Sequence, residues 1–143
     1  MNKILIITII LIIIIIVCYN IITSETFSMN INWKINIPKQ DNTLYKKTST
    51  PSFSGDGESY YVLVYDNKKM KKIDNNFIWK KDKNVDLENN IIKILKRLNV
   101  EETYFPDFNS MYMYDIITDK EDYRNKMYIV KIEDKLYIIE DIY

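Results

Sequence analysis

The longest apolar run of the chain lies at its amino end. Residues 4–22 read ILIITIILIIIIIVCYNII, in which only Thr8 and Asn20 are strongly polar. A helix of this length would span about 28 Å, close to the thickness of the hydrocarbon core of a bilayer. The pattern predicts a transmembrane helix, so that residues 1–24 form a membrane anchor and stem, and residues 25–143 form a separate domain.

The charges that flank this run predict its orientation. Lys3 and the amino terminus precede it, whereas Glu25 and Lys34 are the only charged residues among the fifteen that follow. Positive charge favours the cytoplasmic side of a membrane, so we expect a single-pass protein whose carboxyl-terminal domain lies outside the cell membrane. No small-residue cleavage site follows the run, which favours an uncleaved anchor over a removed signal peptide.

Cys18 leaves a second form of attachment open. A short basic start, an apolar run and then a cysteine are typical of bacterial lipoprotein signals, in which that cysteine carries the lipid. Such signals place a small residue directly before the cysteine, where this chain has Val17. We therefore interpret Cys18 as a small apolar residue of the membrane helix, with lipidation as the alternative. Both interpretations predict a protein tethered to the membrane.

Beyond the stem, the pattern changes to one with a period of two. From Phe27 to Ile37 every second residue is apolar, which predicts a strand with one buried face. Residues 38–54 are rich in Lys, Thr, Ser and Pro, and predict a loop. Residues 60–65 read YYVLVY, apolar on both faces and rich in aromatic and β-branched residues, as in a central strand.

Two later segments have the periodicity of amphipathic helices. Within residues 68–77 the apolar residues recur at i, i+3 and i+7, after Asp66 near the predicted amino end. Residues 87–98 carry one continuous apolar stripe, and Asp86 is a plausible N-cap. We expect both helices to cover a sheet.

The carboxyl end predicts three strands, over residues 111–117, 126–133 and 135–142, with Asp134 at a tight turn between the last two. The predicted order is therefore β-β-α-α-β-β-β. This order indicates an α+β domain in which two helices cover one face of a small, mainly antiparallel sheet.

Composition removes most familiar catalytic chemistries. The chain has no His, one Cys and two Gly, and 20 basic residues balance 20 acidic ones. Without His there is no Ser-His-Asp triad, imidazole base or His-bound metal, and one Cys allows neither an internal disulfide nor a Cys-bound cluster. No glycine-rich phosphate loop occurs, and zero net charge disfavours nucleic acid. We expect no cofactor, no metal and no nucleic-acid partner.

The two glycines flank one carboxylate directly before a predicted strand, in the sequence Gly55-Asp56-Gly57-Glu58. Residues i and i+2 of a strand share a face, so Asp56 and Glu58 could converge as a cation site or an acid/base pair. A tight turn with solvated carboxylates is the more common meaning of such a sequence. These four residues are weak candidates for a binding site, and we assign no catalytic residue.

Charge and aromatic residues suggest two further surfaces. Residues 66–99 hold ten basic and five acidic residues, whereas residues 100–143 hold five basic and eleven acidic ones. The basic part could hold anionic lipid headgroups or wall polymers, although a solvated helix face explains it more simply. The tyrosines, most of them on predicted strands, could form a face that stacks on sugars or binds a protein, but packing within the sheet is the commoner role.

Residues 51–65, PSFSGDGESYYVLVY, with Trp79 and the carboxyl-terminal hairpin, resemble a group of small, uncharacterised, membrane-tethered or lipoprotein-like proteins of Gram-positive bacteria. The shared features are a Phe-x-Gly-Asp-Gly-Glu motif, here Phe53 to Glu58, a later Trp, and a Leu-Tyr pair, here Leu136 and Tyr137. Similar sequences often carry a His just before the motif, which this chain lacks. The resemblance implies the location and the fold rather than an activity.

The exclusions and the predicted anchor together favour a membrane-anchored extracytoplasmic binding or interaction module. Its ligand would be a wall component or a protein, for example a toxin to which it confers immunity. One alternative is a carboxylate-dependent enzyme that uses Asp56 and Glu58. Another is a structural subunit of a membrane complex, held by residues 4–22.

Overall fold

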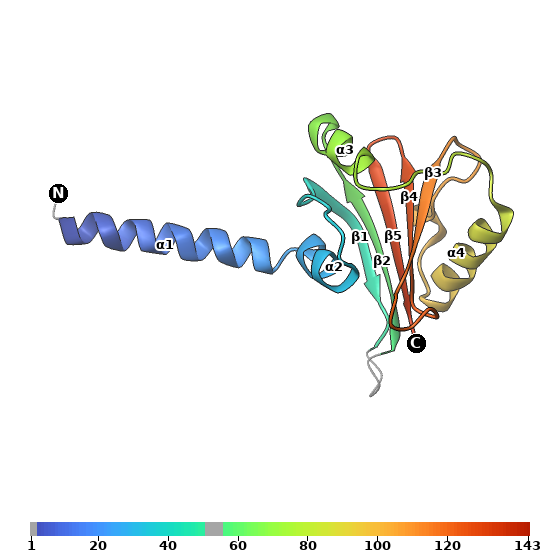
Figure 1. Cartoon of the computed structure of the whole chain (residues 1–143), viewed down its shortest axis with the longest axis horizontal. Coiled ribbons are helices and arrows are strands. Elements are labelled where there is room, and N and C mark those ends of the chain that lie inside the picture. Colours follow the sequence, from blue (N-terminus) through green and yellow to red (C-terminus); the bar gives the residue numbers. More distant parts are fainter. Residues whose placement is uncertain (1–2, 51–55) are drawn as a thin grey trace. The chain divides into compact units, whose positions relative to one another are not determined.

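The computed structural model describes residues 3–50 and 56–143, which divide into two compact units, residues 1–39 and residues 40–143. Figure 1 shows the course of the chain through both units. Each unit is compact on its own.

The amino-terminal unit contains two helices. Helix α1 spans Lys3–Ile22 and α2 spans Glu25–Trp33. The predicted apolar helix is therefore present as a helix. Among the described residues no single helix meets the length and hydropathy expected of a membrane span, whereas Leu5–Asn20 and Glu25–Trp33, bent by 64°, meet them as a pair.

Helix α2 contradicts the strand predicted from Phe27 to Ile37. Its buried residues are Thr26 and Met29, which lie three positions apart as on a helix face. The side chain of Asn30 then holds the following segment: its Oδ1 accepts from Ile37 N at 2.7 Å and its Nδ2 donates to Ile37 O at 2.8 Å. Alternation of apolar residues was misleading here because the helix buries only a few side chains.

The carboxyl-terminal unit is built on one five-stranded sheet. Its strands are β1 (Asn42–Thr48), β2 (Gly57–Val64), β3 (Met113–Thr118), β4 (Lys126–Ile132) and β5 (Lys135–Ile142). They lie in the order β1-β2-β5-β4-β3, and every pairing between neighbours is antiparallel. The α+β class and the antiparallel sheet are thus confirmed, and so is the predicted hairpin, which turns at residues 133 and 134.

Strand β1 lies within the segment that the sequence predicts as a loop. It pairs only with β2 and has a register irregularity between Thr43 and Tyr45. An edge strand of this kind tolerates lysines and other polar residues, because one of its sides faces solvent. Tyr45 supplies its main anchor by stacking on Tyr104, with ring centroids 4.2 Å apart.

The unit also contains helices α3 (Asn67–Asp74) and α4 (Val85–Arg97), and a 3-10 turn, η1 (Glu102–Tyr104). Asp66 caps α3 by accepting from Lys69 N at 2.7 Å, as its position predicts. Helix α4 begins two residues earlier than expected, because Asn84 rather than Asp86 is its N-cap and accepts from Leu87 N at 3.0 Å.

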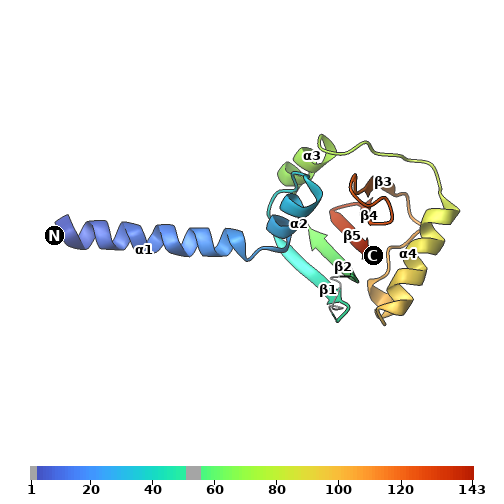
Figure 2. The same cartoon turned by 60° about the horizontal axis from the view of Figure 1, so that its bottom comes forward.

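Helices α3 and α4 lie on opposite faces of the sheet, which corrects the prediction that both cover one face (Figure 2). The core under α4 contains Tyr128 and Val130 of β4. Lys131, the next residue of that strand, points to the other face and pairs with Asp74 of α3. Because the central strands are apolar on both faces, each face has to be covered separately.

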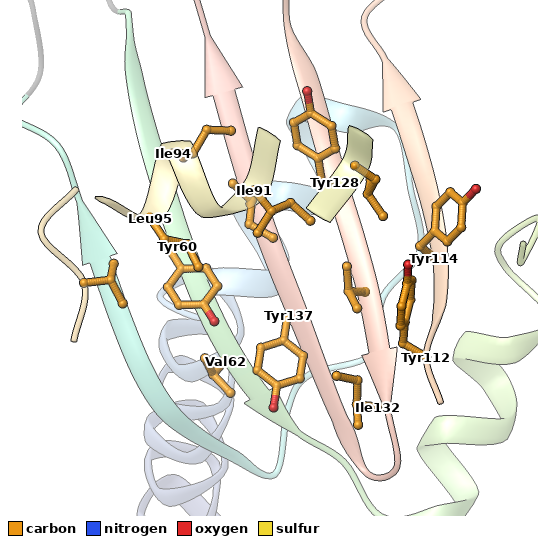
Figure 3. Close-up of a cluster of buried hydrophobic side chains, with 14 of the residues drawn as sticks. Tyr60, Val62, Ile91, Ile94, Leu95, Tyr112, Tyr114, Tyr128, Ile132 and Tyr137 are labelled. Carbon is orange, nitrogen blue, oxygen red and sulfur yellow. The ribbon is translucent and has the colours of Figure 1, made fainter. Parts of the chain in front are cut away.

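Tyrosines make up much of the core beneath α4. Figure 3 shows Ile91, Ile94 and Leu95 of the helix in one cluster with side chains of the strands. All seven tyrosines on predicted strands are buried; these are Tyr60, Tyr61, Tyr65, Tyr112, Tyr114, Tyr128 and Tyr137. Packing, rather than an open binding face, therefore accounts for them.

Candidate functional site

Of the two glycines in the candidate motif, only Gly57 lies among the described residues. Gly55 and Phe53 lie outside the described residues, whereas Gly57 is the first residue of β2. A Cβ atom on Gly57 would lie only 2.7 Å from Ser49 Oγ. That oxygen accepts a hydrogen bond from Glu58 N at 2.9 Å, so it cannot easily move away. Close approach of the neighbouring strand therefore explains why residue 57 is glycine.

Glu58 forms an ion pair with Arg97 of α4. Its Oε1 accepts from Arg97 Nε at 2.6 Å and also contacts Nη2 of the same guanidinium. Asp141 lies directly opposite Glu58 in the β2–β5 pairing, and its Oδ1 is 3.8 Å from Arg97 Nη2. One arginine from the last turn of α4 thus lies between two carboxylates of the sheet.

The pKa values of Arg97 and Asp141 are both raised, for different reasons. The hydrogen bond that Arg97 donates to Glu58 raises the pKa of Arg97, and the charge of Asp141 adds to this effect. Burial raises the pKa of Asp141, and the neighbouring charge of Glu58 raises it further, while Arg97 opposes both. Arg97 therefore opposes the rise in the pKa of Asp141 that burial and Glu58 cause.

Asp56, the other carboxylate of the candidate motif, influences Arg124 rather than Arg97. Its charge contributes to the raised pKa of Arg124, although hydrogen bonds to Asp122 are the larger cause. Those bonds lower the pKa of Asp122 to about 2. Arg97 and Arg124 line the same cavity of about 240 Å³. We call it the paired-charge cavity, because carboxylates of the chain accompany both arginines.

The paired-charge cavity gives little support to a cation site or an acid/base pair formed by Asp56 and Glu58. Glu58 pairs with one arginine that lines it, and the charge of Asp56 acts on the other, so the two carboxylates are directed at different partners. Within the part of the chain that the structure describes, no three Asp, Glu or Cys side chains are grouped so as to hold a metal ion. The arrangement instead fastens α4 to the sheet.

A larger cavity, of about 660 Å³, lies where β3 begins and β4 ends. We call it the lysine cleft. Its apolar wall consists of Phe108, Met111, Tyr112 and Met113, and it is also lined by Lys81, Lys83 and Lys131. A cavity of this volume is within the range of small-molecule sites, which combine apolar walls with a few polar groups.

Hydrogen bonds hold the inner wall of the lysine cleft in position. Tyr112 Oη donates to Glu88 Oε1 at 2.7 Å and accepts from Asn84 N at 2.8 Å, which ties its ring to the start of α4. Phe108 packs edge-on against Tyr112, with centroids 5.3 Å apart. Two backbone hydrogen bonds of 2.9 and 3.0 Å between Lys80 and Tyr114 bring the segment before α4 alongside β3.

The lysines of the cleft are not equivalent. Lys131 is paired with Asp74, and its side chain is only 12% exposed. Lys81 and Lys83 are exposed and form no ion pair with any residue that the structure describes. These two ammonium groups therefore remain available to a ligand.

Sequence reasoning did not identify the lysine cleft. The excess of basic residues in positions 66–99 was its only signal, because that segment includes Lys81 and Lys83. Met111 was predicted as the first residue of a strand, but β3 begins only at Met113, so nothing in the sequence indicated that Met111 borders a cleft. The remaining candidate, Cys18, is exposed on α1.

Comparison with protein-family models, with curated proteins and with solved structures gives no match for this chain.

Proposed function

We propose that the protein is a membrane-anchored binding module, in which residues 4–22 attach the chain to a membrane and the lysine cleft receives the ligand. The proposal is carried by the cleft, where a concave apolar wall lies beside two exposed lysines that have no partner among the described residues. Concave sites of this type are the usual places where proteins bind small ligands.

The anchor is supported by the apolar character of α1. Large apolar side chains such as Leu5, Ile10 and Ile14 are about half exposed along this helix. A continuous apolar surface of this kind is unfavourable in water and favourable in a bilayer. The flanking charges favour an orientation with the carboxyl-terminal unit outside the cell, and lipidation at Cys18 is the alternative form of anchoring.

A binding role is better supported than a carboxylate-dependent enzyme. Glu58 is held by Arg97, and Asp56 acts on Arg124, so both nominated carboxylates take part in charge pairing within the unit. A general acid or base needs a carboxyl group that is free to exchange its proton with a substrate. The resemblance to tethered Gram-positive proteins is consistent with a wall component or a protein as the ultimate partner.

Membrane attachment and orientation can be tested in one experiment. The full chain would be produced in a bacterium, and protoplasts would be treated with protease before and after lysis. We expect digestion of residues 66–143 in intact protoplasts, resistance of the protein to alkaline extraction, and an amino-terminal peptide that begins at Met1. A peptide that begins at lipid-modified Cys18 would instead establish the lipoprotein form.

A matched pair of variants makes this test specific. Ile10→Lys with Ile14→Lys places two charges in the apolar helix, each costing about 3 kcal/mol at the centre of a membrane helix, and should release the protein. Asn89→Lys with Thr103→Lys adds the same charge at exposed positions of the other unit and should not. Release of the unmodified chain by alkali would refute the anchor, and protection until lysis would reverse the orientation.

A further inference from the structure

The lysine cleft contains a charge that the protein itself does not neutralise. Asp74 neutralises Lys131. Among the lining residues this leaves Lys81 and Lys83 as positive groups and Glu133 as the one carboxylate. The remaining charge is therefore about one positive unit, which matches a ligand with a single negative group.

The apolar part of the cleft is fixed on one side and open on the other. Tyr112 is held by Glu88 and Asn84, so its ring is positioned before any ligand arrives. Met111 forms the open side, with 96% of its surface exposed. Methionine is flexible and polarisable, and it adapts well to aliphatic chains of different shape. A fixed aromatic wall beside an adaptable methionine suits an apolar chain rather than a polar ligand.

The edge of the sheet beside the cleft is already occupied. The backbone of Lys80 pairs with Tyr114, and the side chain of Asp115 accepts from Ile78 N at 3.1 Å and from Ile116 N at 2.9 Å. An extended peptide therefore cannot add to this part of β3 as a further strand, which is the usual way in which a sheet edge binds a peptide. This favours a small ligand over a protein segment.

We infer that the lysine cleft binds an amphipathic monoanion, with its carboxylate at Lys81 and Lys83 and its aliphatic chain against Phe108, Tyr112 and Met111. This inference rests on the proposed binding role of the cleft and adds the chemical class of the ligand. The two lysines provide the charge recognition, and burial of methylene groups provides most of the affinity.

The test uses the full chain in lipid nanodiscs, with ¹³C-methyl methionine as the probe, because α1 could itself take up an apolar ligand. Methyl signals of Met111 and Met113 report on the cleft, whereas those of Met70 and Met127, buried elsewhere in the same unit, are internal references. Octanoate should shift the two cleft signals in a saturable way and leave the references unchanged. Shortening the chain to hexanoate should weaken binding about tenfold, because two buried methylene groups are lost.

Variants and related ligands separate the two parts of the inference. Lys81→Glu with Lys83→Glu should weaken octanoate binding about tenfold or more, whereas Lys68→Glu with Lys120→Glu, which makes the same charge change at exposed positions outside the cleft, should not. Met111→Ala should also weaken binding, with Ile78→Ala, 82% exposed and outside the cleft, as its control. Octanamide, which lacks the charge, and acetate, which lacks the chain, should bind much more weakly than octanoate.

Each contrary result has a distinct meaning. Equal binding of octanamide and octanoate, or no saturable shift with octanoate, would overturn the inference. If an acidic peptide such as Glu-Asp-Phe-Asp-Glu shifted the cleft signals and octanoate did not, the amphipathic anion would be refuted while the cleft would remain a binding site. Membrane attachment is measured separately by the protoplast experiment, so failure of one proposal does not obscure the other.

Discussion

Two cavities in the described part of the carboxyl-terminal unit have basic linings, yet their charged residues differ in how far the protein itself pairs them. In the paired-charge cavity, Arg97 is held by Glu58 and Asp141, and Arg124 by Asp122. Lys93 and Lys126 also line this cavity, and they form no ion pair with a residue that the structure describes. In the lysine cleft, Lys81 and Lys83 have no such partner among the described residues. An arginine that the protein has already paired with a carboxylate therefore gives no indication of a ligand. The first cavity is part of what holds the fold together, and the second is open to an outside anion.

Replacing the arginine should have the largest effect. Arg97→Gln removes the cation that contacts both Glu58 and Asp141, whose side chains are only 15% and 13% exposed, and leaves Lys126 as a weaker influence on Asp141. We expect the free energy of unfolding to fall by about 2 kcal/mol at pH 7, less than for a fully buried pair because Arg97 itself is half exposed. Urea denaturation would measure it. Lys96→Gln, exposed in the same turn of α4, should cost less than about 0.5 kcal/mol.

The effect of Arg97→Gln should also depend on pH. The pKa of Asp141 is already raised by burial and by Glu58, and without Arg97 it should rise further. A carboxyl group with a raised pKa in the folded state stabilises the fold while protonated, and this contribution is lost as the pH rises. The difference between wild type and variant should therefore shrink as the pH is lowered from 7 towards about 4. A constant difference across this range would show that Arg97 does not act through these carboxylates.

A smaller effect is expected from the wall of the lysine cleft. Tyr112→Phe removes the hydroxyl that donates to Glu88 and accepts from Asn84 N, and leaves that N–H without its partner. The expected loss is about 1 kcal/mol in the free energy of unfolding. Octanoate should bind more weakly as well, because the ring is no longer held in place. Tyr123→Phe, at a strongly exposed loop position, provides the control and should change neither quantity.

The smallest change in the free energy of unfolding is expected at Asp56, a candidate site residue from the sequence. Asp56→Asn removes a charge whose effect on the pKa of Arg124 is secondary, because Asp122 already holds that arginine. Thermal unfolding should therefore change little, by less than about 0.5 kcal/mol. The shift of the Met111 and Met113 methyl signals by octanoate should also be unchanged. A large loss of the protein's biological activity, with folding intact, would instead favour the carboxylate-dependent enzyme.

Local patterns predicted several elements closely. The apolar run at the amino end forms α1, the stripe of residues 87–98 forms most of α4, and the last two strands form the hairpin of β4 and β5. Each of these has a strong period or a turn within it, so neighbouring residues are sufficient to predict it. The prediction was wrong at Phe27 to Trp33, where a regular alternation of apolar residues lies on a helix that buries few side chains. It was also wrong over β1, because an edge strand can be as polar as a loop.

The candidate sites were predicted less well than the elements. The sequence placed Asp56 and Glu58 in one region, but it did not show that Arg97, 39 residues further on, would pair with Glu58. It did not reveal the lysine cleft either, because the lining residues come from three separate stretches of chain. Side chains so far apart have no shared local pattern.

The sequence by itself determined the α+β class, the apolar amino-terminal helix, the terminal hairpin and the absence of histidine- or disulfide-based chemistry. These depend on composition or on residues close together in the chain. Only the tertiary structure decided that α3 and α4 cover opposite faces and that both arginines of the first cavity are paired with carboxylates. It also decided that Lys81 and Lys83 of the lysine cleft are left without an ion-pair partner among the described residues. Those outcomes depend on contacts between distant residues, whose energies exist only once the chain has folded.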